Sequence, residues 1–96
     1  YAASGGVFLA EERIAFIGAI LEDPESAQQE FNSVVSSFRQ IIRNRSGTPF
    51  PEGVAVISLT VMGDIDRINA LTGRLGQIPN VQVRSAISKR QINREV

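Results

Sequence analysis

The residues of this sequence that are best suited to chemistry are acidic. They cluster in three places along the chain: Glu11–Glu12, Glu22–Glu25 and Asp64–Asp66. Asp23 and Asp64 each stand just before an expected helix, where Asp is a good N-cap and the helix dipole stabilises negative charge. The first pair falls in an expected tail. None of the three clusters therefore predicts a pair of catalytic carboxylates.

Two residue types that carry much of protein chemistry are missing, because the chain has no cysteine and no histidine. Without cysteine there is no disulfide, thiol nucleophile, iron–sulfur cluster or zinc–thiolate site. Without histidine the chain lacks the commonest metal ligand and the commonest general base near neutral pH. We therefore predict a protein that is not an enzyme and has no catalytic residue, no metal site and no cofactor.

Charge is balanced overall, with ten acidic and ten basic residues, but it is uneven along the chain. Acidic residues dominate the early part, whereas most arginines come from Arg39 onward. The later arginines could form an anion-attracting patch, or solvated faces and ion pairs between subunits. Direct nucleic-acid binding is not expected, because dedicated nucleic-acid binders usually carry a clear net positive charge.

Hydrophobic periodicity predicts the elements that must position these side chains. Residues 13–21 form a β-branched and aromatic run that is typical of a strand. A helix should begin at Pro24, since proline suits the first helical position. Its apolar stripe recurs at helical spacing: Ala27, Phe31, Val34 and Phe38. Such a stripe predicts an amphipathic helix that lies on a sheet.

The rest of the chain repeats this order of elements. Strands are predicted at residues 40–46, 54–62 and 81–88, with a second helix between Asp64 and Gly76. A β-α-β-β-α-β order assembles as an antiparallel four-stranded sheet with two helices on one face, the α+β ferredoxin-like fold.

One domain is predicted, and the segments outside it are short. We expect this domain over residues 13–89, with a flexible N-terminal tail at residues 1–12 and a polar C-terminal tail at residues 90–96. The longest apolar runs are far shorter than the roughly 20 residues that cross a bilayer. The start of the chain lacks the basic region of a signal peptide. We therefore expect a cytoplasmic protein without membrane contact.

The first predicted strand is apolar on both of its faces. Its alternating sets are Ile14, Phe16 and Ile20 on one side, and Ala15, Ile17, Ala19 and Leu21 on the other. Two helices on one side of a sheet cover one of these sets, and a second copy of the chain is the simplest cover for the other. We predict a homo-oligomer, a dimer or a tetramer, with Ile17, Ala19 and Leu21 at the interface.

A motif of spaced glycines and aliphatic residues begins in the second predicted helix. The segment from Leu71 to Arg84 reads LTGRLGQIPNVQVR. Together with the first and third strands, it resembles the iron-only hydrogenase system regulator family of small ACT-like proteins, which are also similar to the C-terminal domain of nickel-responsive repressors. The motif residues for which we expect a structural role are Leu71, Gly73, Leu75, Gly76 and Ile78. Gly73 would let the helix approach the sheet closely, and Gly76 could end the helix with a positive φ.

The resemblance implies a ferredoxin-like fold, self-association through the sheet and a regulatory role in hydrogenase systems, with transcription as one level of control. It implies no reaction. Nickel sensing is not carried over, because the metal site of those repressors depends on histidine and cysteine ligands. The candidate partners are a small-molecule effector and a DNA-binding or hydrogenase-related protein.

The turn from Leu21 to Glu25 is similar to the turn after the first strand of amino-acid-binding ACT domains. In those domains an acidic residue and a proline precede the helix, and exposed backbone amides meet the ligand. Asp23 and Pro24 match this pattern, whereas Glu25 replaces the usual glycine, which allows a closer approach of the backbone. The resemblance implies a ligand site at Asp23, Pro24 and Glu25. Helix capping by Asp23 is the structural alternative.

Two other functions use the same order of elements. RNA recognition motifs stack bases on aromatic residues of both central strands, and residues 14–18 echo their first-strand motif, but residues 54–62 contain no aromatic residue. Acylphosphatases use an arginine-bearing phosphate loop after the first strand, where Glu22 and Asp23 would repel phosphate. A homo-oligomeric regulatory module that holds a small ligand at a subunit interface is the leading hypothesis, and RNA binding is the alternative.

Overall fold

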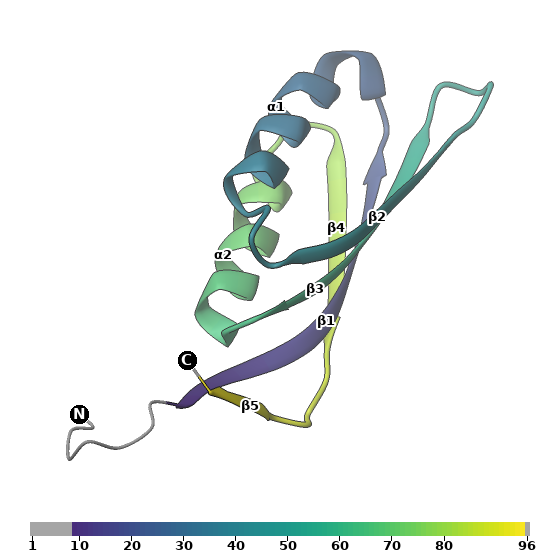
Figure 1. Ribbon diagram of the computed structural model, residues 1–96. Coiled ribbons are helices and arrows are strands. Elements are labelled where there is room, and N and C mark those ends of the chain that lie inside the picture. The colour runs from purple at the N-terminus through teal and green to yellow at the C-terminus, as the bar shows by residue number, and fades with distance from the viewer. Residues whose placement is uncertain (1–8, 96) are drawn as a thin grey trace.

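The computed structural model describes residues 9–95. The central strand of its sheet is β1 (Leu9–Leu21). The elements that follow in chain order are α1 (Pro24–Ser37), β2 (Ile42–Pro49), β3 (Ala55–Gly63), α2 (Ile65–Gly76), β4 (Val81–Ile87) and β5 (Ile92–Glu95). Both helices lie on the same side of the sheet (Figure 1). The predicted ferredoxin-like βαββαβ fold is confirmed.

The sheet has the strand order β2-β3-β1-β4, and β5 pairs with the start of β1. All of these pairs are antiparallel. Ile17 of β1 lies opposite Leu59 of β3 on one side and opposite Ser85 of β4 on the other. β1 is therefore paired on both sides along most of its length, whereas β2 and β4 form the edges.

The hydrophobic core lies between the sheet and the two helices. Phe31 of α1, Leu71 and Leu75 of α2, and Ile17 and Leu59 of the sheet are all fully buried there. The helix residues share one face because they recur every three or four positions, and the strand residues share one face because they alternate. Each such side chain contributes roughly 1.5–3 kcal/mol to stability through its burial.

Two segments that were predicted as tails form strands instead. β1 begins at Leu9, before the predicted start at Arg13, and β5 lies within the predicted polar tail. Residues 9–12 pair with residues 92–95, so each segment provides the hydrogen-bond partners of the other. Neither segment has an alternating apolar pattern that could reveal a strand. Residues 1–8 of the predicted N-terminal tail, and Val96, lie outside the described residues.

β2 lies later in the chain than predicted, at Ile42–Pro49 and not at residues 40–46. The chain first turns after α1, where the Ile41 N–H donates to the Phe38 carbonyl oxygen at 3.0 Å. The strand then continues through Gly47 and Pro49, beyond the predicted end at residue 46. An edge strand tolerates such residues, because one side of its backbone has no neighbouring strand to pair with.

Of the two glycines in the Leu71–Arg84 motif, Gly73 does not have the role that was predicted, and Gly76 ends the helix as predicted but without a positive φ. Gly73 is exposed, and a Cβ there would meet no atom within 4 Å, so it is not a point of close approach between α2 and the sheet. Gly76 ends α2, but the positive φ values among the described residues are at Gly53 (90°) and Asn80 (65°). The aliphatic motif residues are buried in the core: Leu71, Leu75 and Ile78.

Close packing requires a glycine at another position, Gly63, which ends β3. A Cβ on Gly63 would lie 2.7 Å from Cγ2 of the buried Ile41. The Ile41 backbone cannot easily move away, because its carbonyl oxygen accepts a hydrogen bond from the Met62 N–H at 2.8 Å. The segment after α1 is thus held against the end of β3 by both packing and backbone hydrogen bonding.

We predict that Gly63→Ala lowers the free energy of unfolding by about 1–3 kcal/mol, because the added methyl group overpacks this contact. Gly73→Ala is the matched control on an exposed helix position, and it should raise that free energy by up to about 1 kcal/mol through helix propensity. Urea unfolding of both variants measures the two effects. Equal effects at the two positions would contradict the close contact.

Candidate functional site

The side of the sheet that faces away from the helices, here called the open face, carries exposed apolar side chains. They are Ile14 (44% exposed), Phe16 (49%) and Ile20 (38%) of β1 and Val56 (36%) of β3, here called the apolar strip. Ile20 and Val56 lie directly opposite each other in the sheet. Soluble proteins rarely expose a large apolar patch without a binding role, so the strip marks a candidate interaction surface.

The structure corrects the face of β1 that was predicted as the interface. Ile17, Ala19 and Leu21 are at most 2% exposed and belong to the core beneath the helices. The complementary set on β1 is the one that remains exposed. The two apolar sets of this strand look alike in sequence. The pairing of Ile17 with Leu59, whose strand carries Ser58 and Thr60 on its other face, decides which set the helices cover.

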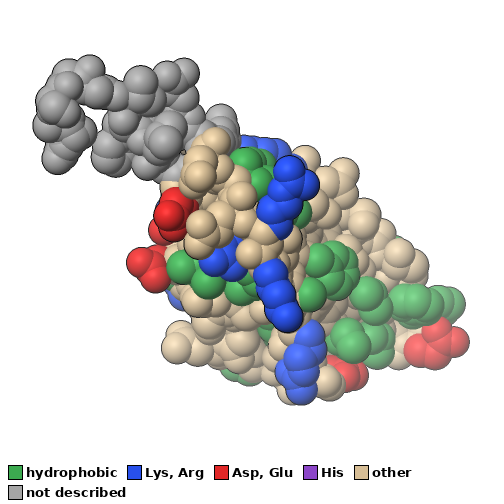
Figure 2. All heavy atoms as spheres, turned by 90° about the horizontal axis from the view of Figure 1, so that it is seen from below, with side chains coloured by type: hydrophobic (Ala, Val, Ile, Leu, Met, Phe, Trp, Pro, Cys, Tyr) green, Lys and Arg blue, Asp and Glu red, His purple; other side chains and the backbone are tan. Residues whose placement is uncertain are grey.

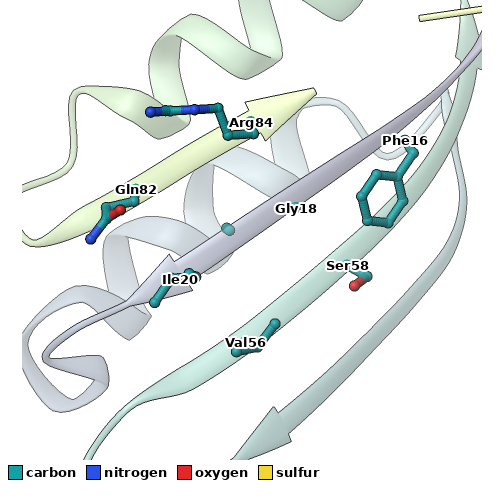
Figure 3. Close-up of a pocket in the computed structure, with 8 residues that line it drawn as sticks. Phe16, Gly18, Ile20, Val56, Ser58, Gln82 and Arg84 are labelled. Carbon is teal, nitrogen blue, oxygen red and sulfur yellow. The ribbon is translucent and has the colours of Figure 1, made fainter. Parts of the chain in front are cut away.

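A hollow of about 280 Å³ lies in the open face above Gly18 (Figure 3), and we call it the open-face hollow. The missing side chain at Gly18 leaves space between Phe16 and Ile20, its neighbours on the same face of β1. The Phe16 ring forms one wall, since a Cβ on Gly18 would lie 3.4 Å from it. The other lining side chains come from β3 and β4: Val56, Ser58, Gln82 and Arg84.

Polar groups stand at the β4 side of this hollow. The Gln82 Nε2 group donates a hydrogen bond to Oε2 of Glu22 at 2.8 Å. The guanidinium of Arg84 donates through Nη1 to the Val83 carbonyl oxygen at 2.9 Å, so it lies along its own strand. Both Gln82 and Arg84 are exposed. The hollow therefore combines apolar walls with one cationic side chain.

Sequence reasoning did not identify Gly18 or Arg84 as site residues. The gap at Gly18 has a recognisable signal, because a glycine between Phe16 and Ile20 interrupts an otherwise bulky alternating face. The position of Arg84 has no such signal. It comes to the hollow because β4 pairs with β1 in the register that sets Arg84 opposite Gly18.

A second hollow of about 260 Å³ lies between the start of α1 and the hairpin that joins β2 to β3. Pro24 and Gln28 of α1 line one side of it, and Arg45 and Phe50 of the hairpin line the other. Arg45 is held in place, because its Nη2 group donates to Oδ1 of Asn32 at 2.7 Å. Its guanidinium also lies 5.7 Å from the centre of the Phe31 ring. We call this the corner hollow.

The three residues predicted as a ligand site lie at the start of α1, but only Pro24 lines the corner hollow. The main-chain oxygen of Asp23 accepts hydrogen bonds from the N–H groups of Ser26 (3.2 Å) and Ala27 (3.1 Å). The Asp23 carboxylate does not cap the helix by a side-chain hydrogen bond. Glu25 is exposed in the first turn. A ligand site at these residues therefore stays a prediction.

Several basic side chains lie beside apolar side chains on the surface. Figure 2 shows Lys and Arg side chains in a row with apolar side chains on either side. Several arginines have local partners: the Arg74 guanidinium lies 5.5 Å from the centre of the Phe38 ring, and Arg13 donates to the Ser88 carbonyl oxygen at 3.2 Å. These contacts support solvated arginine faces more than a dedicated anion patch.

Within residues 9–95, no helix is long and apolar enough to span a membrane. The acidic side chains of the same residues do not gather in a group of three or more that could hold a metal ion.

Comparison with known proteins identifies similar chains. A model of the family TM1266-like, described as "Iron-only hydrogenase system regulator, putative", matches residues 13–85. The uncharacterized protein TM1266 from Thermotoga maritima is 35% identical, with a TM-score of 0.77 over 81% of this chain and 99% of that chain. The de novo designed protein Foldit4 is 11% identical, with a TM-score of 0.55 over 82% and 98% of the two chains, and shares the fold alone. No curated protein matches the sequence.

We predict that Gly18→Ala leaves the free energy of unfolding within about 1 kcal/mol of the wild-type value, because a methyl group there meets the Phe16 ring at an ordinary contact distance. The glycine is thus explained by the space it leaves above the sheet and not by the fold. Urea unfolding checks this expectation. A loss as large as that expected for Gly63→Ala would show that Gly18 is required for packing.

Proposed function

This chain belongs to the TM1266-like family of iron-only hydrogenase system regulators, and on that premise we propose that it is a non-catalytic regulatory module that assembles into a homo-oligomer through its open face. The family membership predicted from the Leu71–Arg84 motif is confirmed. It supports the regulatory part of the proposal. The apolar strip is the single observation that supports the assembly.

The apolar strip holds most of the exposed apolar bulk of the described residues. Of the six large hydrophobic side chains that are exposed there, four belong to the strip, and the other two are Phe50 and Ile65. A symmetric interface uses the same patch of both copies, so a dimer would bury eight strip side chains. Partly exposed side chains of this size contribute roughly 1 kcal/mol each when they are fully buried.

The size of this contribution favours an assembly that can be regulated. Eight side chains would supply on the order of 8 kcal/mol. Association costs an estimated 4–15 kcal/mol in lost translational and rotational freedom. The two quantities are comparable, so the strip alone supports a weak, concentration-dependent oligomer. An effector that binds the assembly slightly more tightly than the single chain, or the reverse, would then change the oligomeric state.

A small-molecule effector and a protein partner complete the proposed role. The predicted ligand site at Asp23, Pro24 and Glu25 is supported by the corner hollow, which Pro24 lines. A DNA-binding or hydrogenase-related protein would supply the output, because the apolar faces of both helices are committed to the core through residues such as Phe31 and Leu71. Such helices offer no recognition helix of their own.

RNA binding remains the alternative use of the open face, and Phe16 is the observation that favours it. Phe16 is exposed on β1, where a base could stack on its ring. The neighbouring positions of β3 on this face are Val56, Ser58 and Thr60, none of which offers a ring. Assembly has the stronger support, because it uses all four side chains of the apolar strip.

We predict that Phe16→Asp and Ile14→Asp each weaken self-association at least about tenfold, because each replaces, in both copies, an apolar side chain of the interface with a carboxylate that must lose water. Ile65→Asp is the matched control, since Ile65 is 43% exposed but begins α2, away from the open face. Sedimentation equilibrium over a range of concentrations measures the three variants. A wild-type protein that stays monomeric at concentrations up to about 1 mM would refute the proposed assembly.

A further inference from the structure

The open-face hollow has the shape of a site for a small apolar group. Phe16 and Ile20 rise on either side of Gly18, and Val56 closes a third side from β3 (Figure 3). The walls already stand in place, because the Phe16 ring lies at van der Waals distance from the Gly18 position. Preformed apolar concavities with a few polar groups at the edge are typical of small-molecule sites.

The polar edge of the hollow favours a negatively charged group. Arg84 is the charged side chain among the lining residues, and its planar guanidinium can bind a carboxylate through two parallel hydrogen bonds. In the structure one of its N–H groups bonds to the Val83 carbonyl oxygen, and the guanidinium lies over β4 beside the hollow. To reach the hollow this exposed side chain would change its rotamer, and rotamer changes of this kind are common at binding surfaces.

The proposed assembly would bury the charge of Arg84, and a bound anion would pair with that charge. A two-fold interface joins the same patch of both copies, so the Arg84 of one copy meets a surface that carries a second Arg84. Two cations that lose water against each other are costly unless an anion accompanies them. Glu22 is the nearby carboxylate that could offset this charge, but its hydrogen bond from Gln82 holds it beside Gln82. The proposed assembly therefore favours an additional anion at Arg84.

We propose that the open-face hollow binds a small carboxylate with an apolar tail, and that the second copy of the chain closes over it, an inference that rests on the proposed assembly. The tail lies between Phe16, Ile20 and Val56, above Gly18. The carboxylate bonds to Arg84, with the Ser58 hydroxyl beside it, and the Gln82 amide keeps its hydrogen bond to Glu22. No covalent step is involved.

Ligand binding and self-association are then coupled. A ligand that binds the assembled state more tightly than the single chain shifts the equilibrium toward assembly, and assembly tightens ligand binding by the same coupling factor. The regulatory module would thus convert the concentration of a small carboxylate into an oligomeric state. This identifies a second site for the effector, separate from the one predicted at Asp23, Pro24 and Glu25.

The test uses 4-methylpentanoate as the probe, with 4-methylpentanamide as its uncharged counterpart and sodium chloride to match the ionic strength. Sedimentation measures self-association of the full chain with each compound at up to about 10 mM, a range that detects weak binding. Amide NMR signals of 15N-labelled protein report local binding at Gly18. We expect the acid to tighten self-association at least about tenfold and to shift the Gly18 signal, and the amide to do neither.

Three variants assign the effect to the hollow. Arg84→Gln should tighten self-association without ligand, because it removes the cation repulsion, and should abolish the response to the acid. Gly18→Val should abolish the response by filling the hollow. Arg67→Gln is the matched control on α2, where Arg67 bonds to Oε1 of Gln40 at 3.4 Å, and it should respond like the wild type.

The outcomes separate this inference from the proposed assembly. Equal effects of the acid and the amide, or a full response in Arg84→Gln, would overturn the carboxylate site. A wild-type protein that assembles through the apolar strip and ignores the acid would overturn the site and leave the assembly standing. A monomer whose Gly18 signal shifts with the acid alone would refute the assembly and support the hollow as a carboxylate site.

Discussion

Coverage of the sheet is the constraint on which the rest of this structure depends. Two helices pack against one face, and β1 is apolar on both faces. The core beneath the helices is complete, with Phe31, Leu71 and Leu75 fully buried against β1 and β3. The open face therefore keeps apolar side chains that stability of the single chain does not require. Their exposure is the physical basis for an interaction role.

The sequence predicts the parts of the fold that bury apolar residues at a regular period. The two helices and β3 are recognisable because their apolar residues recur at helical or alternating spacing. β5 is not recognisable, since residues 92–95 become a strand only through pairing with residues 9–12. Which face of β1 the helices cover also depends on pairing, here of Ile17 with Leu59, and strand register is not visible in one sequence.

The candidate site shows the same division between local pattern and long-range pairing. The alternation of β1 shows that Gly18 lies between two bulky residues of one set, but it does not show which set is exposed. The contribution of β4 cannot be read from any local pattern, because Arg84 reaches the hollow through the pairing of β4 with β1. The glycine that close packing requires is also set by a long-range contact and not by the local motif. Gly73 belongs to the recognisable motif yet meets open space, whereas Gly63 is held against Ile41, a contact that joins segments with no shared motif.

A weak assembly with an unpaired charge at its interface, as proposed here for the open face and Arg84, suits a regulator better than a permanent oligomer does. An obligate oligomer buries a larger and more hydrophobic surface. The apolar strip supplies a contribution of the same order as the cost of association, so neither the free chain nor the assembly dominates by a wide margin. In the proposed assembly Arg84 would set the direction of control, because its charge would oppose the approach of a second identical face. A module with these two features responds most strongly to an anion that enters between the copies.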